Sequence, residues 1–550
     1  MYPASDDLSA RINGPWPGFV QHFDDNLVIG SAKPASWILC WSHFDEREGH
    51  RVRVSAPETA DCLARLMVPD IDSPTSDSPN RDEVRREEFY LRVAINGHAY
   101  FGVSFVQRTR SLTGRGLVQE AIGVFGPETD ASSSCHSVLK LVLTSLYVST
   151  ADTLEVPSDS ERLLRLSDVA VENCQQVFDE VLDSLKSRDR SCFEVRRSTG
   201  NRISVMRSEP DFSLFSCWRP VVERIHVLWE AILQGASVVV VSSDASRSSK
   251  AVLSLKHLLL PFLSLSDLDY SPLITTFHPQ FHAVLEHLQS SFHATQKIIG
   301  GVNPLLYNAK CPNILLVSLD TKRSPSKGMD VIFSTEKEGL QSWLAGSFSS
   351  VLAFPQSYVG NLVLTGSQEA LESVNDTTLR RYFLETNTTF LRPLLQALDR
   401  RLEAILSDLE ANPFRLLRRD MAKTWLPIQQ FLDSVEEGRS PCDVDFDVPL
   451  WRGLKPKGVA AFYSNFLKRP VGQQWLQKEE RSRKETAQLH RLNCLLKVSP
   501  DRQFPPLQQA LEVLMEVEEC DSGTITDSER AKLAQLHLQI KATTPEHKDM

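Results

Sequence analysis

Long apolar runs are missing from this 550-residue sequence, and their absence argues against a membrane-spanning protein. No stretch approaches the run of about 18 apolar residues that a transmembrane helix needs. The first residues, MYPASDDLSARINGPWPGF, are polar and carry Asp6 and Asp7, so they do not predict a signal peptide. We therefore expect a cytoplasmic chain with no transmembrane segment. The glycosylation patterns that begin at Asn375 and Asn387 are then expected to be coincidental.

Paired cysteines are missing too. The ten cysteines are scattered, with no CxxC and no zinc-ribbon spacing, so we expect buried thiols in a reducing compartment. His278-Pro-Gln-Phe-His282 has metal-like spacing, but it lacks the glutamate of HExxH, and its proline prevents a shared helix face. DVDFD (443–447) begins like a calcium loop, but the sixth and twelfth positions are Val448 and Leu454. No metal and no cofactor are expected.

An excess of basic charge is also missing. The chain has 60 Lys and Arg residues against 70 Asp and Glu residues, a formal charge of −10, with no long basic stripe. A nucleic-acid partner would require a strongly positive surface, so none is expected. Any membrane association would have to pass through a partner rather than a polybasic patch. The 41% hydrophobic and 24% charged residues are ordinary values for packed globular domains.

The first third of the chain is rich in β-strand patterns. Asn96-Gly97 joins two β-rich runs and predicts a hairpin over 88–109. Alternation over 35–45 places one set of residues (Ile38, Cys40 and Ser42) on one face of a strand and another (Trp37, Leu39 and Trp41) on the opposite face. The other elements expected here are a helix over 57–67, a strand over 116–126, helices over 135–149 and 167–187, and a hairpin formed by CFEVRR and RISVMR.

From Pro220 onward, helical patterns alternate with near-continuous apolar strands, which predicts a largely parallel sheet covered on both faces. The expected helices cover 220–234, 246–260 and 281–291, and the expected strands cover 237–241, 272–277, 296–299 and 313–318. Beyond about residue 365 the pattern is helical, with one long helix over 378–410 that Pro393 could kink and two more within 458–496. The predicted fold class is therefore α/β plus α.

The stretch SVVVVSSDASRSSKAVLSL (237–255) has the strand–turn–helix layout of a phosphate loop. Backbone amides can close around a phosphate only where glycines remove the Cβ atoms, and 242–249 contains no glycine. We expect instead that Ser243, Asp244 or Ser246 caps the following helix, and that the turn is available as a contact surface. Because GxSxG is also absent, no covalent chemistry is predicted, and protein binding is favoured.

The stretch 211–255 resembles the central module of DENN-domain proteins, most closely the DENN domain-containing protein 6 subfamily. That subfamily has a Leu-Phe-x-x-Phe-Arg-Pro run, a helix with Leu-Trp-Glu, a strand and a Ser-Ser turn. Here these are LFSCWRP (214–220), with tryptophan in place of the second phenylalanine, then Leu228-Trp229-Glu230 and Ser248-Ser249. Further stretches agree in order, at 100–126, 298–320, 378–398 and 461–476. The segments 69–88 and 321–365 and the tail match poorly.

The resemblance implies a tripartite architecture: a disordered N-terminus (1–33), a longin-like upstream module (34–190), a central α/β DENN module (191–365), a helical downstream module (366–496) and a C-terminal tail (497–550). It also implies guanine nucleotide exchange on a Rab-type small GTPase, promoting GDP release in endosomal or vesicle traffic, with the chain recruited to endosomes. Two other roles stay open: a non-catalytic Rab effector or scaffold, and a GTPase-activating role of the kind found in some DENN relatives.

If the resemblance holds, the GTPase-binding surface is expected at the strand–helix turn and on a neighbouring turn. Arg247 and Lys250 are expected to pair with carboxylates of the GTPase switch segments, and Asp244 to compete near its metal ion. For each residue the alternative is an ordinary helix cap or a solvated charge. The full set of expected contact residues is Ser243, Asp244, Arg247, Ser248, Lys250 and Asn303.

Overall fold

The structure is a computed structural model. It describes residues 37–45, 49–56, 62–68, 84–95, 98–110, 117–128, 134–150, 164–186, 192–196, 202–208, 210–262, 268–289, 296–303, 305–306, 314–320, 331–333, 368–414, 425–437, 455–495, 497, 513 and 534–538. The expected disordered N-terminus (1–33) and the DVDFD stretch lie outside the described residues. Most of 321–365 and of the tail also lie outside them.

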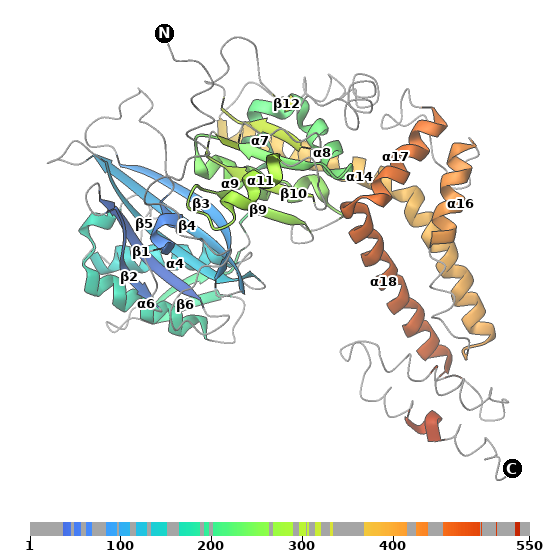
Figure 1. Cartoon of the computed structure of the whole chain (residues 1–550). Coiled ribbons are helices and arrows are strands. Elements are labelled where there is room, and N and C mark those ends of the chain that lie inside the picture. The colour runs from blue at the N-terminus through green and yellow to red at the C-terminus, as the bar shows by residue number, and fades with distance from the viewer. Residues whose placement is uncertain are drawn as a thin grey trace, which may run out of the picture.

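The first part of the chain forms an antiparallel five-stranded sheet in the order β2-β1-β5-β4-β3 (Figure 1). Its strands are β1 (Ile38–Asp45), β2 (Gly49–Ala56), β3 (Arg85–Ile95), β4 (His98–Arg110) and β5 (Leu117–Pro127). Ile95 pairs with His98, so only two residues separate β3 from β4. The hairpin predicted from Asn-Gly is therefore confirmed.

Both faces of this sheet are buried, and the alternation predicted for β1 is confirmed. Ile38 and Cys40 belong to the core that contains residues of helix α2 (Cys62–Met67). Leu39 and Trp41 face the opposite core, which contains residues of α4 (Cys135–Thr150) and α6 (Val171–Leu185). A strand covered by helices on both faces must be apolar at successive positions, as β1 is. The short helix η1 (Leu166–Asp168) precedes α6.

The second predicted hairpin also forms, as β6 (Cys192–Arg196) paired with β7 (Arg202–Met206). It is a separate two-stranded sheet, and both of its strands contact helices of the first sheet's outer layer, α4 and α6. Val195 and Ile203 are buried in the same core as these helices. The hairpin is thus packed with the first sheet rather than with the second.

The second sheet has the order β12-β11-β8-β10-β9, and four of its strands run parallel. These are β8 (Ser237–Val241), β9 (Asp269–Ile274), β10 (Lys297–Gly301) and β11 (Ile314–Ser318). β12 (Val331–Phe333) pairs antiparallel at the edge. The largely parallel sheet predicted from the apolar strands is therefore confirmed, and β9 begins three residues earlier than expected.

Apolar residues of β8 alternate between two cores. Val239 and Val241 join the cluster that includes Phe281 of helix α11 (Phe281–Gln289). Val238 and Val240 join the large core that includes residues of α8 (Ile225–Leu233), α9 (Ala245–Ser254) and α10 (Lys256–Leu259). All five residues of β8 are buried, which explains why its sequence is almost entirely valine.

The helix predicted over 220–234 differs in its first turns. Helix α7 (Leu214–Trp218) is followed by a 3-10 segment, η2 (Arg219–Arg224), and only then by α8. Val221, with φ −125° and ψ 16°, lies outside the helical region and kinks the chain there. The predicted stop is confirmed: Gly235 has φ +78°, which glycine adopts without strain, and the N–H of Ala236 donates to the carbonyl of Ala231.

The last part is helical, and a 44-residue helix, α14 (Gln368–Ala411), connects it to the second sheet (Figure 1). The other helices are α16 (Trp425–Glu436), α17 (Pro456–Lys468) and α18 (Pro470–Leu495). The ring of Phe390 stacks on Tyr463 with centroids 4.9 Å apart, and the Tyr463 hydroxyl donates to the Phe390 carbonyl at 2.8 Å. Leu379, Phe383, Phe390, Leu394 and Leu398 of α14 are buried in the large core.

Two further findings concern the described residues. Their helices include none that is long and apolar enough to cross a bilayer. The side chains of six cysteines are described, all as free thiols, and three of them are buried: Cys40, Cys135 and Cys174. Burial raises the pKa of Cys135 and Cys174, so both stay protonated.

Candidate protein-docking surface

The turn after β8 is organised by its own side chains. Asp244 is the N-cap of α9, and its carboxylate accepts a hydrogen bond from the N–H of Arg247 at 3.2 Å. The predicted capping role is therefore confirmed, and Asp244 is the residue that fills it. The Ser242 hydroxyl accepts from the N–H of Asp244 at 3.2 Å, which tightens the turn further.

A second carboxylate closes the same turn. Asp320, just past the end of β11, accepts from the Ser242 hydroxyl at 2.9 Å and from the Ser243 N–H at 2.7 Å. Two carboxylates, those of Asp244 and Asp320, therefore lie at the beginning of α9 and accept from the N–H groups of Arg247 and Ser243. A phosphate would meet two negative charges there, which disfavours a nucleotide at this position.

Ser248 holds α9 against the sheet from inside. Its hydroxyl donates to the Val240 carbonyl at 2.9 Å and accepts from the Gly301 N–H at 2.9 Å, and the side chain is 0% exposed. The neighbouring Gly300 permits this packing, because a Cβ there would lie 2.0 Å from the Pro272 carbonyl oxygen. In this arrangement Ser248 supports the turn and does not reach the surface.

Asn303 stands at the end of the adjacent strand, β10. Its side-chain amide donates to the Thr276 hydroxyl at 3.0 Å, and its carbonyl oxygen accepts from the N–H of Leu305 at 2.8 Å. Thr276 follows β9, and Asn303 follows β10, so the ends of neighbouring parallel strands meet at one edge of the sheet. Open α/β sheets bind their ligands at the carboxyl ends of their strands.

This carboxyl edge abuts the first sheet. The Ser249 hydroxyl accepts from the N–H of Tyr90 in β3 at 3.2 Å, and both groups are buried. Ala245 and Leu273 share a core with α2 and with residues of β3. The Phe277 ring lies 5.4 Å from the ring of His50 in β2. The turn that carries the candidate residues is thus at the junction of the two sheets.

The junction carries an ionised carboxylate next to α9. Glu88 of β3 contacts the Tyr90 hydroxyl and lies 2.8 Å from the Nδ1 atom of His136. Burial alone would raise the pKa of Glu88, but the His136 hydrogen bond and the charges of His136 and Lys250 hold it below its usual value. Lys250 therefore already interacts electrostatically with the first sheet.

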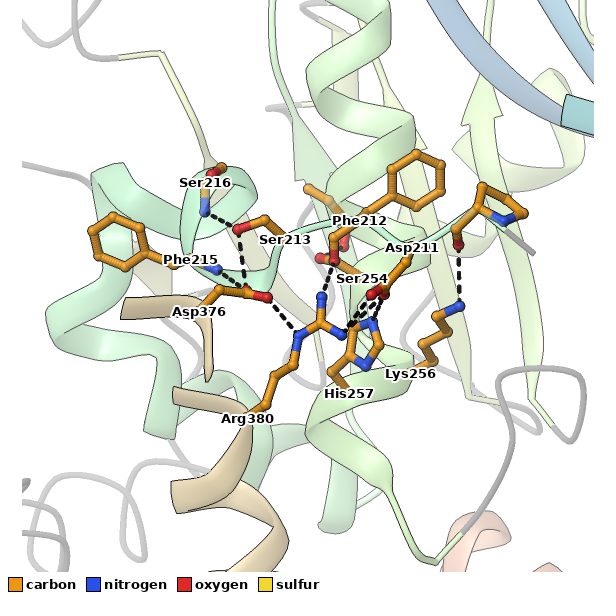
Figure 2. Close-up of polar contacts among 12 residues, drawn as sticks. Asp211, Phe212, Ser213, Phe215, Ser216, Ser254, Lys256, His257, Asp376 and Arg380 are labelled. Atoms are coloured by element: carbon orange, nitrogen blue, oxygen red, sulfur yellow. Dashed lines mark hydrogen bonds and ion pairs between the residues drawn. The ribbon is translucent and has the colours of Figure 1, made fainter. Parts of the chain in front are cut away.

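A separate polar cluster fixes α14 to the second sheet's helices (Figure 2). The Arg380 guanidinium contacts both oxygens of Asp211 at 2.9 and 3.0 Å, donates to the Phe212 carbonyl at 3.1 Å and pairs with Asp376 at 2.6 Å. His257 lies 2.9 Å from the same Asp211. Burial acts to raise the pKa of Asp211, but Arg380 and His257 hold it low, so the carboxylate stays ionised.

Asp376 completes the cluster by binding the beginning of α7. Its carboxylate accepts from the Ser213 hydroxyl at 3.1 Å and from the Phe215 N–H at 3.0 Å (Figure 2). Ser213 is itself the N-cap of α7 and accepts from the Ser216 N–H. Two of the four free amides at this helix start are therefore satisfied, one by a residue of α14.

Asn387, two turns beyond Arg380 along α14, makes a second attachment. Its amide donates to the carbonyls of Leu258 and Leu260 at 2.8 and 2.6 Å, and its oxygen accepts from the indole N–H of Trp229 at 2.6 Å. The side chain is 0% exposed. The amide that the sequence pattern would offer to glycosylation is thus a buried structural group.

The structure brings most of the expected residues together. Ser243 is exposed, and Asp244, Arg247 and Lys250 are partly exposed in the first two turns of α9, with Asn303 on the neighbouring strand end. Sequence reasoning missed Asp320, because its partners Ser242 and Ser243 are 78 and 77 residues away.

In the His278–His282 pair, His278 is buried with its Nε2 atom 2.9 Å from the Arg92 carbonyl oxygen, while His282 is exposed. Nowhere in the described ranges do three or more His, Cys, Asp or Glu side chains form a potential metal site.

Comparison with known proteins supports the resemblance. No protein-family model matches the chain. The chain is similar to Protein DENND6A of Mus musculus, with 24% identity over 276 residues, which cover 48% of this chain and 41% of that protein. It is similar to Protein DENND6A of Gallus gallus, with 26% identity over 195 residues (34% and 32% coverage), and to Protein DENND6B of Homo sapiens, with 25% identity over 199 residues (34% and 32%).

The resemblance inferred from the motifs is confirmed by these matches: the chain is related to the DENN proteins. Its relatives among them are of the DENND6 kind. The match spans about a third to two fifths of the length of these relatives. The mixed sheets and helices described above agree with a DENN-type fold.

Proposed function

We propose that the chain is a guanine nucleotide exchange factor for a Rab-type small GTPase and promotes GDP release in endosomal or vesicle traffic. The observation that carries this proposal is the carboxyl edge of the second sheet, where Ser243, Asp244, Arg247 and Asn303 reach the surface at the junction with the first sheet. The carboxylates of Asp244 and Asp320 lie at the start of α9 and would repel a phosphate, so the edge suits a protein better than a phosphate.

The same proposal includes the tripartite organisation. The upstream, longin-like module covers 34–190, the central DENN module 191–365 and the helical downstream module 366–496, although the β6–β7 hairpin at the start of the central range packs against helices of the upstream module. Two observations support it: α2, α4 and α6 pack against strands of the first sheet while α8 packs against the second, and α14 contacts α7 and α10 beside the second sheet as well as α16 and α18. The protein would act from the cytoplasm and reach endosomal membranes through its GTPase.

An exchange factor works by differential binding. It binds the nucleotide-free GTPase more tightly than the loaded form, and this difference in affinity weakens the hold of the GTPase on GDP. Arg247 and Lys250 would pair with switch carboxylates. The Asp244 oxygen that does not cap α9 would face the metal site of the GTPase. Ser248 would act only by holding the turn in place.

Release of mant-GDP from a panel of Rab GTPases tests this function. The variant should combine Asp244→Asn with Arg247→Glu, because asparagine still caps the helix while its charge is lost. The matched control is Arg381→Glu, an exposed arginine on α14 far from the edge in sequence. We expect the double variant to lose most of the acceleration and the control to keep it. Equal rates for wild type and the double variant would reject this surface.

A further inference from the structure

A hollow of about 440 Å³ lies between α16 and α17, away from the two sheets. Its floor is apolar: Leu432, Ala460 and Leu467 are at most 9% exposed and belong to the large core. Small side chains along α17 keep it shallow, because Ala460, Ala461 and Ser464 all line it. A helix surface with small residues lets a second helix approach closely.

The two walls of this hollow carry opposite charges. Asp433 and Glu436 stand on α16, and Lys457 and Lys468 stand on α17, all of them exposed. Among the described residues none of these four side chains forms an ion pair, although Asp433 accepts a hydrogen bond from Gln429 at 2.7 Å. Four charges thus surround one partly apolar hollow without neutralising one another.

The charges of this hollow are complementary to those of a second copy of the same hollow. If a second copy faces the first with a twofold axis along the hollow, the acidic wall of each copy lies over the basic wall of the other. A twofold axis across the hollow would instead place acidic walls on acidic walls and is disfavoured. We propose that the α16–α17 face is a homodimer interface with the first of these symmetries, in which Asp433 and Glu436 of one copy face Lys457 and Lys468 of the other.

The proposal is independent of the exchange activity, since it concerns helices remote from the carboxyl edge of the second sheet. The association depends on ion pairs between side chains that are exposed on each copy, so it should be weak and should weaken further as salt is raised. Sedimentation velocity of the full chain across about 1–100 μM should show a monomer–dimer equilibrium that weakens as salt is raised. A chain that stays monomeric over this range at low salt would overturn the proposal.

Charge reversal separates this interface from any other. D433K/E436K makes both walls basic, and K457E/K468E makes both walls acidic, so each variant alone should dimerise at least about tenfold more weakly. Mixed together, the two variants should form a heterodimer, because each offers the wall that the other needs. Variants that dimerise like wild type, or a mixture that stays monomeric, would contradict the proposal.

Two controls make the result decisive. All four substituted side chains are exposed, so the melting temperature of each variant should match that of wild type. Ala461→Trp fills the hollow without changing charge and should also abolish the dimer, and the charge-reversed partner should not rescue it. Dimerisation that survives Ala461→Trp would show that the copies meet elsewhere.

Discussion

The Ser249 hydroxyl and the Tyr90 N–H form a buried hydrogen bond of 3.2 Å that joins α9 to strand β3. The two residues are 159 positions apart, and the bond is made next to the turn that carries the candidate docking residues. The first sheet therefore helps to set the orientation of α9. Ser249 also donates to the Ser246 carbonyl, so its hydroxyl is used in both directions.

Removing this hydroxyl should destabilise the protein. Ser249→Ala leaves the buried Tyr90 N–H without its acceptor, and we expect a loss of about 1–3 kcal/mol in the free energy of unfolding. Ser246→Ala, on the same helix and partly exposed, should cost less than about 0.5 kcal/mol. Urea unfolding and amide exchange at Tyr90 measure both effects. Equal losses for the two variants would show that the bond contributes nothing.

Replacing Arg380 by lysine should destabilise the protein. One guanidinium contacts Asp211, the Phe212 carbonyl and Asp376 at once, and a lysine ammonium has no comparable planar fork. We expect Arg380→Lys to lower the free energy of unfolding by about 1–3 kcal/mol. Its neighbour Arg381 pairs with Glu385 on the exposed face, so Arg381→Lys should stay within about 0.5 kcal/mol of wild type. If urea titrations give the same free energy of unfolding for the two variants, the Arg380 contacts do not stabilise the fold.

Glu230 should make stability depend on pH. Burial in α8 raises its pKa from 4.5 to about 8, so the folded chain keeps a proton that the unfolded chain releases above pH 4.5. Stability is therefore lost progressively as pH rises from about 4.5 toward 8. Glu230→Gln mimics the protonated form and should gain up to about 3 kcal/mol at pH 7, with little gain near pH 4.5.

Unfolding of Glu230→Gln and wild type should be compared at several pH values. The difference between them must grow with pH for the assignment to hold. Glu286→Gln serves as the control, because Glu286 is exposed on α11 and its substitution should change stability little at any pH. A constant difference between Glu230→Gln and wild type would mean that Glu230 titrates normally.

Elements set by local pattern were predictable from the sequence. The alternation of β1, the Asn-Gly hairpin, the valines of β8 and the Asp244 cap each depend on residues within a few positions of one another. Helix α16 was also accessible, because Ile428, Phe431 and Val435 recur at helical spacing, yet it was not predicted. The 3-10 turns before α8 were not visible, since nothing in the pattern marks Val221 as non-helical.

Contacts between distant segments were beyond sequence reasoning. Periodicity shows which face of β3 is buried. It does not predict that the Tyr90 N–H bonds to Ser249, or that Asp320 accepts hydrogen bonds from Ser242 and Ser243. Pro393 illustrates the same limit, because α14 continues through it while Phe390 and Leu394 on either side are buried. Tertiary packing there outweighs the lost backbone hydrogen bond.

The central claim is that this chain binds an emptied GTPase in preference to a loaded one. The most direct test is the affinity of the full chain for one responsive Rab in three states: nucleotide-free, GDP-bound and GTP-bound. The account predicts tightest binding to the nucleotide-free state, weakened by the Asp244→Asn and Arg247→Glu pair. Tightest binding to the GTP-bound state would instead identify an effector, and a preference for a mimic of the hydrolysis transition state would identify a GTPase activator. Either result would contradict the account.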